Sequence, residues 1–325
     1  SNYYFSDIGL VYADELLKVS GFEKGYFGNS GAEANEAAIK LARKYGQLNG
    51  GEKRKTIVTL EKSFHGRTLA TLTATGQDKF HPECFAPYPE GFKTIKANDY
   101  EAIKTAFDDT TAAFFVECIQ GEGGVNLLDP AWIQAASDAA RAAGAIVMAD
   151  EVQTGIGRTG TFLASDFLDF KPEVVTLAKG IAGGLPMGAC LFRGKAADVF
   201  VAGDHQSTFA GNPLVCAAAK VVLETVADWE FLDRVNHVGD YIRGAISSWN
   251  LPIVKGVRGR GLMIGTQIDS SVKPFDIEVK CLEKGLCTTV AGADVVRFLP
   301  PLTISDKEVE QGLAIYKEVL ESFCK

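Results

Sequence analysis

Two charged residues each close an apolar run in the middle of the chain. The run Ala145–Ala149 ends at Asp150, and the run Val174–Ala178 ends at Lys179. Both runs have the length and the β-branched content of buried strands. Ligands of open α/β sheets bind beyond the carboxyl ends of the strands, so two neighbouring strands would bring Asp150 and Lys179 to one ligand.

An amine and a carboxylate at one ligand suit pyridoxal phosphate (PLP). This cofactor needs a lysine that forms a Schiff base with it and an acid that keeps its pyridine nitrogen protonated. A single Lys or Asp at a strand end is more often a solvated turn residue. The interpretation of Lys179 and Asp150 therefore depends on the other motifs of the chain.

A helix start near residue 30 could bind a phosphate group. Ser30 and Glu33 have the spacing of a capping box, which predicts a helix that begins at about Gly31. Small residues at such an N-terminus leave backbone N–H groups open to an anion. The alternative is a plain capped helix, which is the commoner case for one segment taken alone.

A short loop, Ser63–Thr68, follows the predicted strand Thr56–Leu60. In this loop Phe64 offers a flat face on which a ring can stack, and Arg67 offers a planar fork suited to a carboxylate. Taken singly, a core phenylalanine and a surface arginine are the commoner interpretations. A loop histidine is more often structural than catalytic, so we assign His65 no catalytic role.

Two further segments place charges in apolar surroundings. The run Ala113–Glu117 is another buried strand that ends in an acid, and the glycine-rich segment Cys118–Gly124 follows it. Near the C-terminus, Arg297 lies within the apolar run Val295–Leu302. Unpaired burial of a charge is costly, so Arg297 must be paired or functional.

The segment Gly155–Gly160 has the spacing G-x-G-x-x-G after a strand. That spacing indicates a dinucleotide site only where it opens a helix. The residues Thr161–Asp166 that follow show no helical stripe, and the preceding strand ends in two acids, which are poor neighbours for a pyrophosphate. We therefore reject the dinucleotide-binding interpretation.

Strand and helix patterns alternate from Thr56 to Leu177, which predicts an α/β fold with a mostly parallel sheet between helices. The run Met187–Phe192 is a further strand, which could be antiparallel. The helix Leu214–Val226 is expected to lead into a second unit. We expect a large domain over residues 1–227 and a smaller α+β domain over residues 228–325.

The composition is that of an ordinary globular protein. The 325 residues are 46% hydrophobic and 23% charged, and the net charge of −8 argues against a nucleic-acid or membrane partner. No apolar run approaches the ~20 residues of a membrane span. Seven cysteines without C-x-x-C pairing indicate reduced thiols in a cytoplasmic compartment, and we expect no metal. The start at Ser1 lacks both an initiator Met and a signal peptide, so we expect residues upstream.

Together these motifs resemble the class III, fold-type I PLP-dependent aminotransferases, with the closest likeness to the acetylornithine aminotransferase group. The resemblance covers essentially the whole chain. Its most specific segments are Ala149–Gly155 followed by Leu177–Gly180, together with Asn29–Glu36 and Ser207–Pro213. It implies the PLP-transferase fold, in which a seven-stranded sheet forms the core of the large domain.

The resemblance implies a set of cofactor contacts. Lys179 would hold PLP and shuttle the proton, and Asp150 would pair with the pyridinium nitrogen. Gln153 would lie near the phenolic oxygen, and Phe64 would stack on the ring. At the helix start, Ser30, Gly31 and Ala32 would bind the phosphate. Thr208 would reach the phosphate in the neighbouring subunit, so the resemblance also implies a homodimer with a shared site.

The resemblance also implies how substrates are held. Arg297 would grip the α-carboxylate of 2-oxoglutarate or glutamate, and Glu122 would pair with Arg297 while the amino donor is bound. Arg67 would hold a carboxylate of the donor. Ser207 is a further candidate contact to substrate, and Glu117 is expected to line the site.

The expected reaction is ping-pong transamination of N-acetylornithine with 2-oxoglutarate in arginine synthesis. The alternatives are ornithine, succinylornithine or 4-aminobutyrate as the donor, and a PLP-binding module without activity. His65 favours acetylornithine, because ornithine-specific members tend to carry tryptophan after the stacking phenylalanine. Cys118 stands where the family usually has proline, which removes no functional group. Members normally have an N-terminal segment that contributes to the substrate pocket, and this sequence does not show one.

Overall fold

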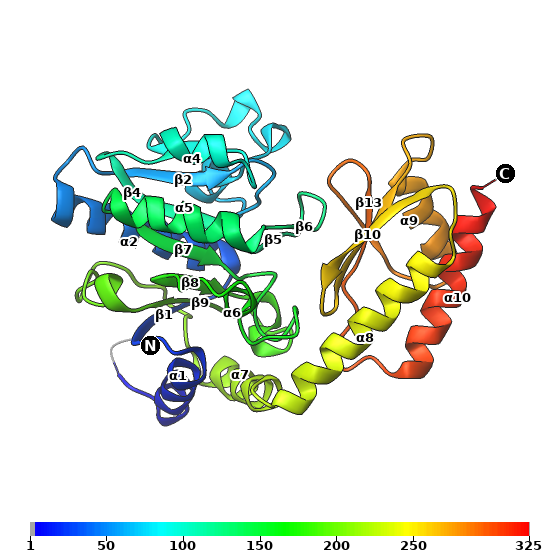
Figure 1. Cartoon of the computed structure of the whole chain (residues 1–325). Coiled ribbons are helices and arrows are strands. Elements are labelled where there is room, and N and C mark those ends of the chain that lie inside the picture. Colours follow the sequence, from blue (N-terminus) through cyan, green and yellow to red (C-terminus); the bar gives the residue numbers. More distant parts are fainter. Residues whose placement is uncertain (1–3, 325) are drawn as a thin grey trace.

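The computed structural model describes residues 4–324, and its centre is a seven-stranded sheet (Figure 1). The strands are, in sheet order, β1 (Lys24–Gly28), β9 (Gly188–Phe192), β8 (Val174–Leu177), β7 (Ile146–Asp150), β4 (Thr111–Glu117), β2 (Thr56–Leu60) and β3 (Phe92–Ile95). Neighbouring strands from β8 to β3 are parallel, and β9 is antiparallel to both β8 and β1. The predicted mostly parallel sheet and its antiparallel strand are confirmed.

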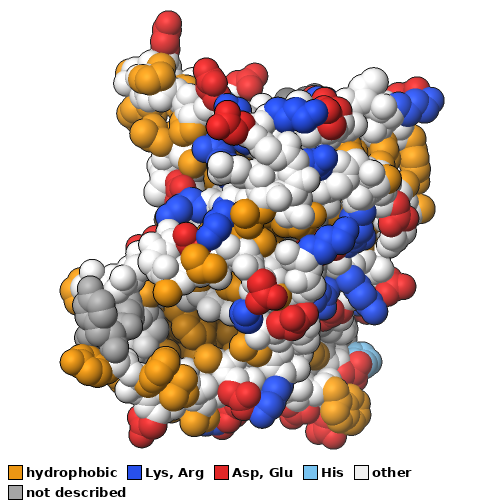
Figure 2. All heavy atoms as spheres, turned by 90° about the vertical axis from the view of Figure 1, so that its left-hand side faces the viewer, with side chains coloured by type: hydrophobic (Ala, Val, Ile, Leu, Met, Phe, Trp, Pro, Cys, Tyr) orange, Lys and Arg blue, Asp and Glu red, His pale blue; other side chains and the backbone are white. Residues whose placement is uncertain are grey.

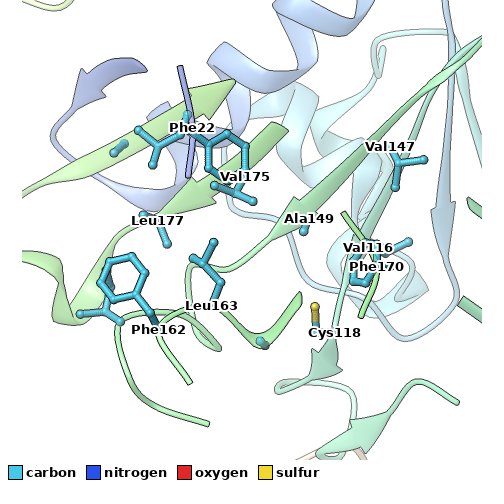
Figure 3. Close-up of a cluster of buried hydrophobic side chains, with 14 of the residues drawn as sticks. Phe22, Val116, Cys118, Val147, Ala149, Phe162, Leu163, Phe170, Val175 and Leu177 are labelled. Carbon is cyan, nitrogen blue, oxygen red and sulfur yellow. The ribbon is translucent and has the colours of Figure 1, made fainter. Parts of the chain in front are cut away.

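Both faces of this sheet are buried, because side chains alternate between two hydrophobic clusters. On β7, for example, Ile146 and Met148 pack on one face while Val147 and Ala149 pack on the other. Figure 3 shows the cluster that contains Val147 and Ala149. Phe162 and Leu163, from the segment that follows β7, belong to the same cluster. Burial on both faces explains why these strands appear in the sequence as continuous apolar runs.

Helices cover the two faces unequally. The long helix α2 (Gly31–Gly50) packs on one face, against β9, β4 and β8. On the other face lie α1 (Asp7–Ser20), α4 (Tyr100–Ala106), α5 (Pro130–Ala142), α6 (Ala164–Phe167) and α7 (Pro213–Val226). The short helix α3 (Leu69–Ala74) contacts α2. The sheet is therefore the middle of three layers, and its strand ends are held in place from both sides.

A smaller unit follows in the chain. Its four-stranded antiparallel sheet has the order β10 (Val254–Arg260), β11 (Met263–Ile268), β13 (Val295–Phe298) and β12 (Thr289–Ala291). Its helices are α8 (Trp229–Ser248), α9 (Pro274–Glu283) and α10 (Asp306–Ser322), which share one hydrophobic cluster with the sheet. The predicted boundary at residues 227 and 228 falls between α7 and α8 (Figure 1), and the exact division into domains remains a prediction.

A short hairpin reaches from the large sheet toward the smaller one. It consists of β5 (Ile119–Gln120) and β6 (Asn126–Leu127), and its tip is the glycine-rich segment that follows Glu117. Ile119 and Val125 of the hairpin share a buried cluster with Met263, Ala291 and Val295 of the smaller sheet. The hairpin tip is thus packed against the smaller unit.

The sequence patterns missed several elements, among them β1, β3, β5, β6, β12, α6 and α9. Most of these are short or lie at an edge of their sheet, so their hydrophobic pattern is weak. The segment Gly155–Gly160 forms turns and opens no helix, as expected. Within residues 4–324, no helix is long and apolar enough to cross a membrane.

Candidate active site

A cavity of about 450 Å³ lies where β4, β7 and β8 end. The strand register explains which side chains meet there. Glu117, the last residue of β4, lies beside Asp150, the last residue of β7, and Asp150 lies beside Thr176 of β8. Lys179 follows β8 by two residues, so the parallel strands bring the amine and both carboxylates to one edge of the sheet. All three of these charged residues line the cavity.

Three N–H groups hold the carboxylate of Asp150. The backbone N–H of Val152 donates to Oδ1 at 3.0 Å, and Asn35 Nδ2 donates to Oδ2 at 2.8 Å. His65 Nδ1 also lies 2.8 Å from Oδ2, and because a carboxylate only accepts, this nitrogen carries the proton. Such charge-assisted hydrogen bonds stabilise the ionised form and fix its orientation.

Two of these partners were not predicted as part of the site. His65 has a fully buried side chain and stacks on the ring of Phe115 with centroids 4.4 Å apart. Asn35 lies on the buried face of α2 and also donates to the His65 carbonyl oxygen at 2.6 Å. A polar residue among the alanines of an otherwise apolar helix face was the available signal for Asn35.

Lys179 combines an unusual backbone conformation with an altered acidity. Its φ of 49° lies in the left-handed region, which strains a residue other than glycine and is common at functional sites. The side chain is exposed to the cavity, yet desolvation by the cavity walls lowers the pKa of its amine. The charges of Asp150 and Glu117 act in the opposite direction and only partly offset this effect.

Glu117 is almost completely buried beside Asp150. Burial and the neighbouring Asp150 charge raise its pKa well above the usual value for glutamate. The Phe64 backbone N–H donates to its Oε2 at 2.9 Å, which opposes that shift. This contact fixes the loop that carries Phe64 over the cavity, so Glu117 serves the site through the position of Phe64.

The N-terminus of α2 forms another wall of the cavity. Ser30 is the N-cap, and its hydroxyl accepts the backbone N–H of Glu33 at 3.2 Å, while the Glu33 carboxylate accepts the backbone N–H of Asn29. The first N–H groups of a helix lack partners within the helix, and Gly31 and Ala32 supply them at the cavity wall. A β-carbon on Gly31 would lie 2.7 Å from Val152 Cγ1, so only glycine lets the helix approach so closely.

The predicted pair of Glu122 and Arg297 is formed. Arg297 Nη1 donates to Glu122 Oε1 at 2.7 Å and to Gln153 Oε1 at 3.0 Å. Gln153 Nε2 in turn donates to Glu122 Oε1 at 3.3 Å. Burial alone would raise the pKa of Glu122, but the Arg297 charge and these hydrogen bonds outweigh it and lower the pKa.

This trio links the cavity to the smaller unit. Gln153 lines the cavity, whereas Glu122 and Arg297 lie behind it. The Gly292 backbone N–H donates to the Glu122 carbonyl oxygen at 2.9 Å, and Arg258 Nε donates to the Gly124 carbonyl oxygen at 2.9 Å. The loop at the hairpin tip is therefore held by the smaller unit at three points, including the ion pair itself.

Arg67 and Phe64 lie together at the mouth of the cavity. The guanidinium carbon of Arg67 is 5.5 Å from the Phe64 ring centroid and 4.4 Å from that of Phe80. Phe80 ends the short 3₁₀ helix η1 (Asp78–Phe80), which the sequence analysis did not connect with the site. Arg67 is exposed, as a residue that receives a ligand from solution needs to be.

Ser207 and Thr208 do not line this cavity. They lie in a second cavity of about 670 Å³, beside α1 and β1. Asn29, at the start of α2, donates from Nδ2 to Ser207 Oγ at 2.8 Å and so joins the two regions. Several large hydrophobic side chains around the second cavity are exposed, namely Tyr4, Phe5, Leu10 and Phe209.

The surface around α1 has an apolar character. In Figure 2, hydrophobic side chains gather in the lower half of the view, at the level where α1 and α7 lie in Figure 1. Charged side chains of both signs are scattered over the rest of this face (Figure 2). Exposed apolar patches of this kind typically mark sites where another molecule docks.

Known proteins with similar sequences share most of the length of this chain. An acetylornithine aminotransferase of Haemophilus ducreyi is 45% identical over 321 residues, which is 98% of this chain and 80% of that protein. The enzyme of the same name from Caldanaerobacter subterraneus is 43% identical over 322 residues, or 98% of this chain and 81% of that protein.

Solved structures of aminotransferases also superpose on this chain. An ornithine aminotransferase of Toxoplasma gondii superposes with a TM-score of 0.93 at 31% identity, over 99% of this chain and 78% of that one. An N-acetylornithine aminotransferase of Stenotrophomonas maltophilia superposes with a TM-score of 0.84 at 35% identity, over 99% of this chain and 81% of that one.

The family model described as aminotransferase class III matches residues 2–320, which is nearly the whole chain. The matched region contains the strand ends, the helix start and the ion pair described above. The fold, the arrangement of the cavity and these sequence similarities agree with one another. The chain therefore belongs to the class III aminotransferases.

Proposed function

We propose that this protein transfers the terminal amino group of N-acetylornithine to 2-oxoglutarate, with PLP as its cofactor. The observation that carries the proposal is the convergence of Lys179 and Asp150 at one cavity beside the N-terminus of α2. The relatives that are 40–45% identical over most of the chain bear the name of this activity.

The residues of the cavity fit PLP in chemical type. Gly31 and Ala32 offer N–H groups and the positive end of the α2 dipole to a phosphate. The carboxylate of Asp150, which accepts three N–H groups, suits a protonated pyridine nitrogen, and Phe64 offers a ring to stack on. A solved structure that is similar to this chain, the ornithine aminotransferase of Toxoplasma gondii, shows partial occupancy of PLP at its active site. Bound PLP would supply the electron sink that stabilises a carbanion at the substrate.

Lys179 then has two roles, both of which need a free amine at ordinary pH. Its amine would hold the cofactor, and it would also move a proton at the reacting carbon of the substrate. The lowered pKa makes the neutral amine more accessible than in an ordinary lysine. The strained backbone at this position fixes where the side chain enters the cavity.

The ion pair of Glu122 and Arg297 would let one site accept two unlike substrates. With the pair closed, as in this structure, Arg297 is neutralised and does not attract the carboxylate of the amino donor. With Glu122 moved away, Arg297 is free to bind a carboxylate of 2-oxoglutarate bidentately. Gln153, which contacts both residues, would couple this switch to the cofactor.

Arg67 would bind the carboxylate of the amino donor at the mouth of the cavity. Ornithine is the second candidate donor, because the ornithine aminotransferase of Toxoplasma gondii superposes well on this chain. N-acetylornithine is favoured by the higher identity to acetylornithine aminotransferases and by His65, which occupies a place where the ornithine-specific members tend to have tryptophan.

A homodimer with a shared site is part of the proposal. Ser207 and Thr208 lie outside the cavity that contains Lys179 and within a region rich in exposed apolar side chains. A second copy that docks on this region would bring its own Thr208 toward the cofactor phosphate. The cytoplasmic location inferred from the scattered cysteines stays a prediction.

An absorption titration tests the donor. The protein is loaded with PLP, and the visible band is followed as N-acetylornithine, ornithine or 4-aminobutyrate is added. We expect the band to bleach at the lowest concentration with N-acetylornithine and to return with 2-oxoglutarate. If another amine bleaches the band at a lower concentration, that amine is the donor instead of N-acetylornithine. If the loaded protein shows no band, the assignment of PLP as the cofactor is contradicted.

A further inference from the structure

The surroundings of Arg67 differ from those of two other stacked arginines of this protein, and unlike Arg260, which lies over Phe167, Arg67 lines the cavity that contains Lys179. Arg43 and Arg193 also lie over phenylalanine rings, but each also donates to backbone carbonyl oxygens, so their guanidinium groups are structural. Within residues 4–324, Arg67 has neither a carboxylate within 4.0 Å nor a hydrogen bond to a carbonyl oxygen, and its contacts are the rings of Phe64 and Phe80. Its N–H groups are therefore available to a ligand.

Phe80 makes the closer of these two contacts. The guanidinium carbon lies 4.4 Å from the Phe80 centroid, against 5.5 Å for Phe64. A guanidinium stacked on a ring is attracted by the electron-rich face and still presents its N–H groups at the edge. The two phenylalanine rings also contact one another, edge to face, with centroids 5.5 Å apart. Phe64 is the proposed wall of the cofactor site, so the stack connects Arg67 to that wall.

The segment that carries Phe80 is tied to the loop that carries Arg67. Gln77 Nε2 donates to the Ser63 carbonyl oxygen at 3.0 Å, and the Gly76 backbone N–H donates to Ser63 Oγ at 3.0 Å. The Phe80 backbone N–H closes the turn by donating to the Gln77 carbonyl oxygen at 3.0 Å. These hydrogen bonds hold the segment of Phe80 beside the loop Ser63–Arg67, although Phe80 lies 13 positions after Arg67 in the sequence.

We propose that Phe80 is a positioning residue, which holds the Arg67 guanidinium in the orientation that receives the carboxylate of the amino donor. The proposal rests on the proposed function, because it assigns Phe80 to the donor half of that reaction. A long arginine side chain on the surface samples many rotamers, and ordering it on binding costs free energy. A ring that holds the guanidinium in advance lowers this cost for the carboxylate that binds Arg67.

The test measures the two half-reactions of the PLP-loaded protein separately. In Phe80→Leu we expect the KM for N-acetylornithine to rise about three- to tenfold, because the cation–π contact is lost. The kcat should stay within about twofold of the unaltered protein, since Lys179 and Asp150 are untouched. Phe80→Tyr keeps the ring and should retain the original KM for the donor. Phe80→Met, in parallel, removes the ring but fills similar space, which guards against a folding defect in the leucine variant.

A second set of variants separates positioning from a general structural role. In an Arg67→Ala background, Phe80→Leu should cause no further rise in the donor KM, because the group that it orients is gone. Phe85→Leu removes an exposed phenylalanine from the neighbouring segment and is the matched control, with no change expected.

Three outcomes would overturn the proposal. They are an unchanged donor KM in both Phe80→Leu and Phe80→Met, a fall in kcat with no change in the donor KM, or an effect that persists without Arg67. An Arg67→Ala variant with an unchanged donor KM would instead overturn the role of Arg67 in the proposed function, and so can be told apart from a failure of Phe80 alone.

Discussion

At the scale of single residues, the site depends on partners that set the charge and direction of each reactive group. Asp150 shows this most clearly, because three N–H donors surround it and one comes from a buried histidine. We interpret His65 as a residue that positions Asp150 and not as a proton donor to substrate, since its Nδ1 proton is already committed to the carboxylate.

Replacement of His65 by leucine should weaken PLP binding about tenfold or more, because a hydrogen bond to the charged Asp150 is lost. His65→Asn keeps an N–H donor near the position of Nδ1 and should retain most of the affinity. PLP affinity of the apoprotein is measured by equilibrium dialysis. His237→Leu, an exposed histidine of α8, is the control and should bind normally. Unaltered affinity in His65→Leu would show that Asp150 does not need this partner.

Glu117 provides a prediction about pH. Burial and the Asp150 charge raise its pKa well above 4.5 in the folded protein, so the unfolded chain releases its proton more readily. The carboxyl therefore lowers the free energy of unfolding progressively as the pH rises above about 4.5. Glu117→Gln removes this effect and keeps an acceptor for the Phe64 N–H. We expect the difference in melting temperature between this variant and the unaltered apoprotein to move in favour of the variant as the pH rises above about 4.5. A margin that stays constant or shrinks would contradict the raised pKa.

At the scale of elements, the strand ends and the hairpin tip decide which side chains meet. Gly121 is the tightest point of this arrangement, because a β-carbon there would lie 1.9 Å from Gln153 Oε1 and 2.8 Å from Met263 Cε. A side chain at this position would displace the ends of Gln153 and Met263, and Gln153 contacts both Glu122 and Arg297.

Gly121→Ala should therefore displace the Gln153 side chain and weaken the ion pair of Glu122 with Arg297, which Gln153 supports. We expect the catalytic efficiency with the amino donor to fall about tenfold, since Arg297 is no longer neutralised in that half-reaction, and overpacking of this size typically costs 1–3 kcal/mol. Gly244→Ala is the matched control, because a β-carbon there meets no atom within 4 Å and the residue lies inside α8. Kinetics indistinguishable from the control would show that the loop tolerates displacement.

The sequence was informative where an element has a strong pattern. The strands that end at Glu117 and Asp150, the capped helix that begins at Gly31 and the pairing of Arg297 were all predictable, because continuous apolar runs and a buried charge have few alternative explanations. The roles of Asn35 and Phe80 were not predictable, since each depends on contacts between segments that are distant in the sequence. The position of Thr208 outside the main cavity also became visible only in three dimensions.

At the scale of the whole molecule, the proposed sharing of the site between two subunits predicts the behaviour of mixed dimers. Thr208→Val should weaken PLP binding in a homodimer, and Lys179→Ala should abolish activity in one. In a mixed dimer of these two variants, the subunit with an intact Lys179 would receive an intact Thr208 from its partner. One site should then regain the PLP affinity and turnover of the unaltered protein.

Co-expression with two different affinity tags isolates the mixed dimer for this measurement, and each homodimer serves as its control. Recovery of turnover to about half that of the unaltered protein is expected, because one site of two is complete. Turnover no higher than that of the Thr208→Val homodimer would show that Thr208 acts within its own subunit or not at all.

Chemical trapping shows whether Lys179 holds PLP. The PLP-loaded protein is reduced with borohydride, digested, and mapped by mass spectrometry. We expect the added mass on the peptide that contains Lys179, and none on any peptide of a Lys179→Ala variant treated in the same way. Trapping of PLP on a different lysine, or retention of PLP by the unaltered protein without any trapped lysine, would contradict the account.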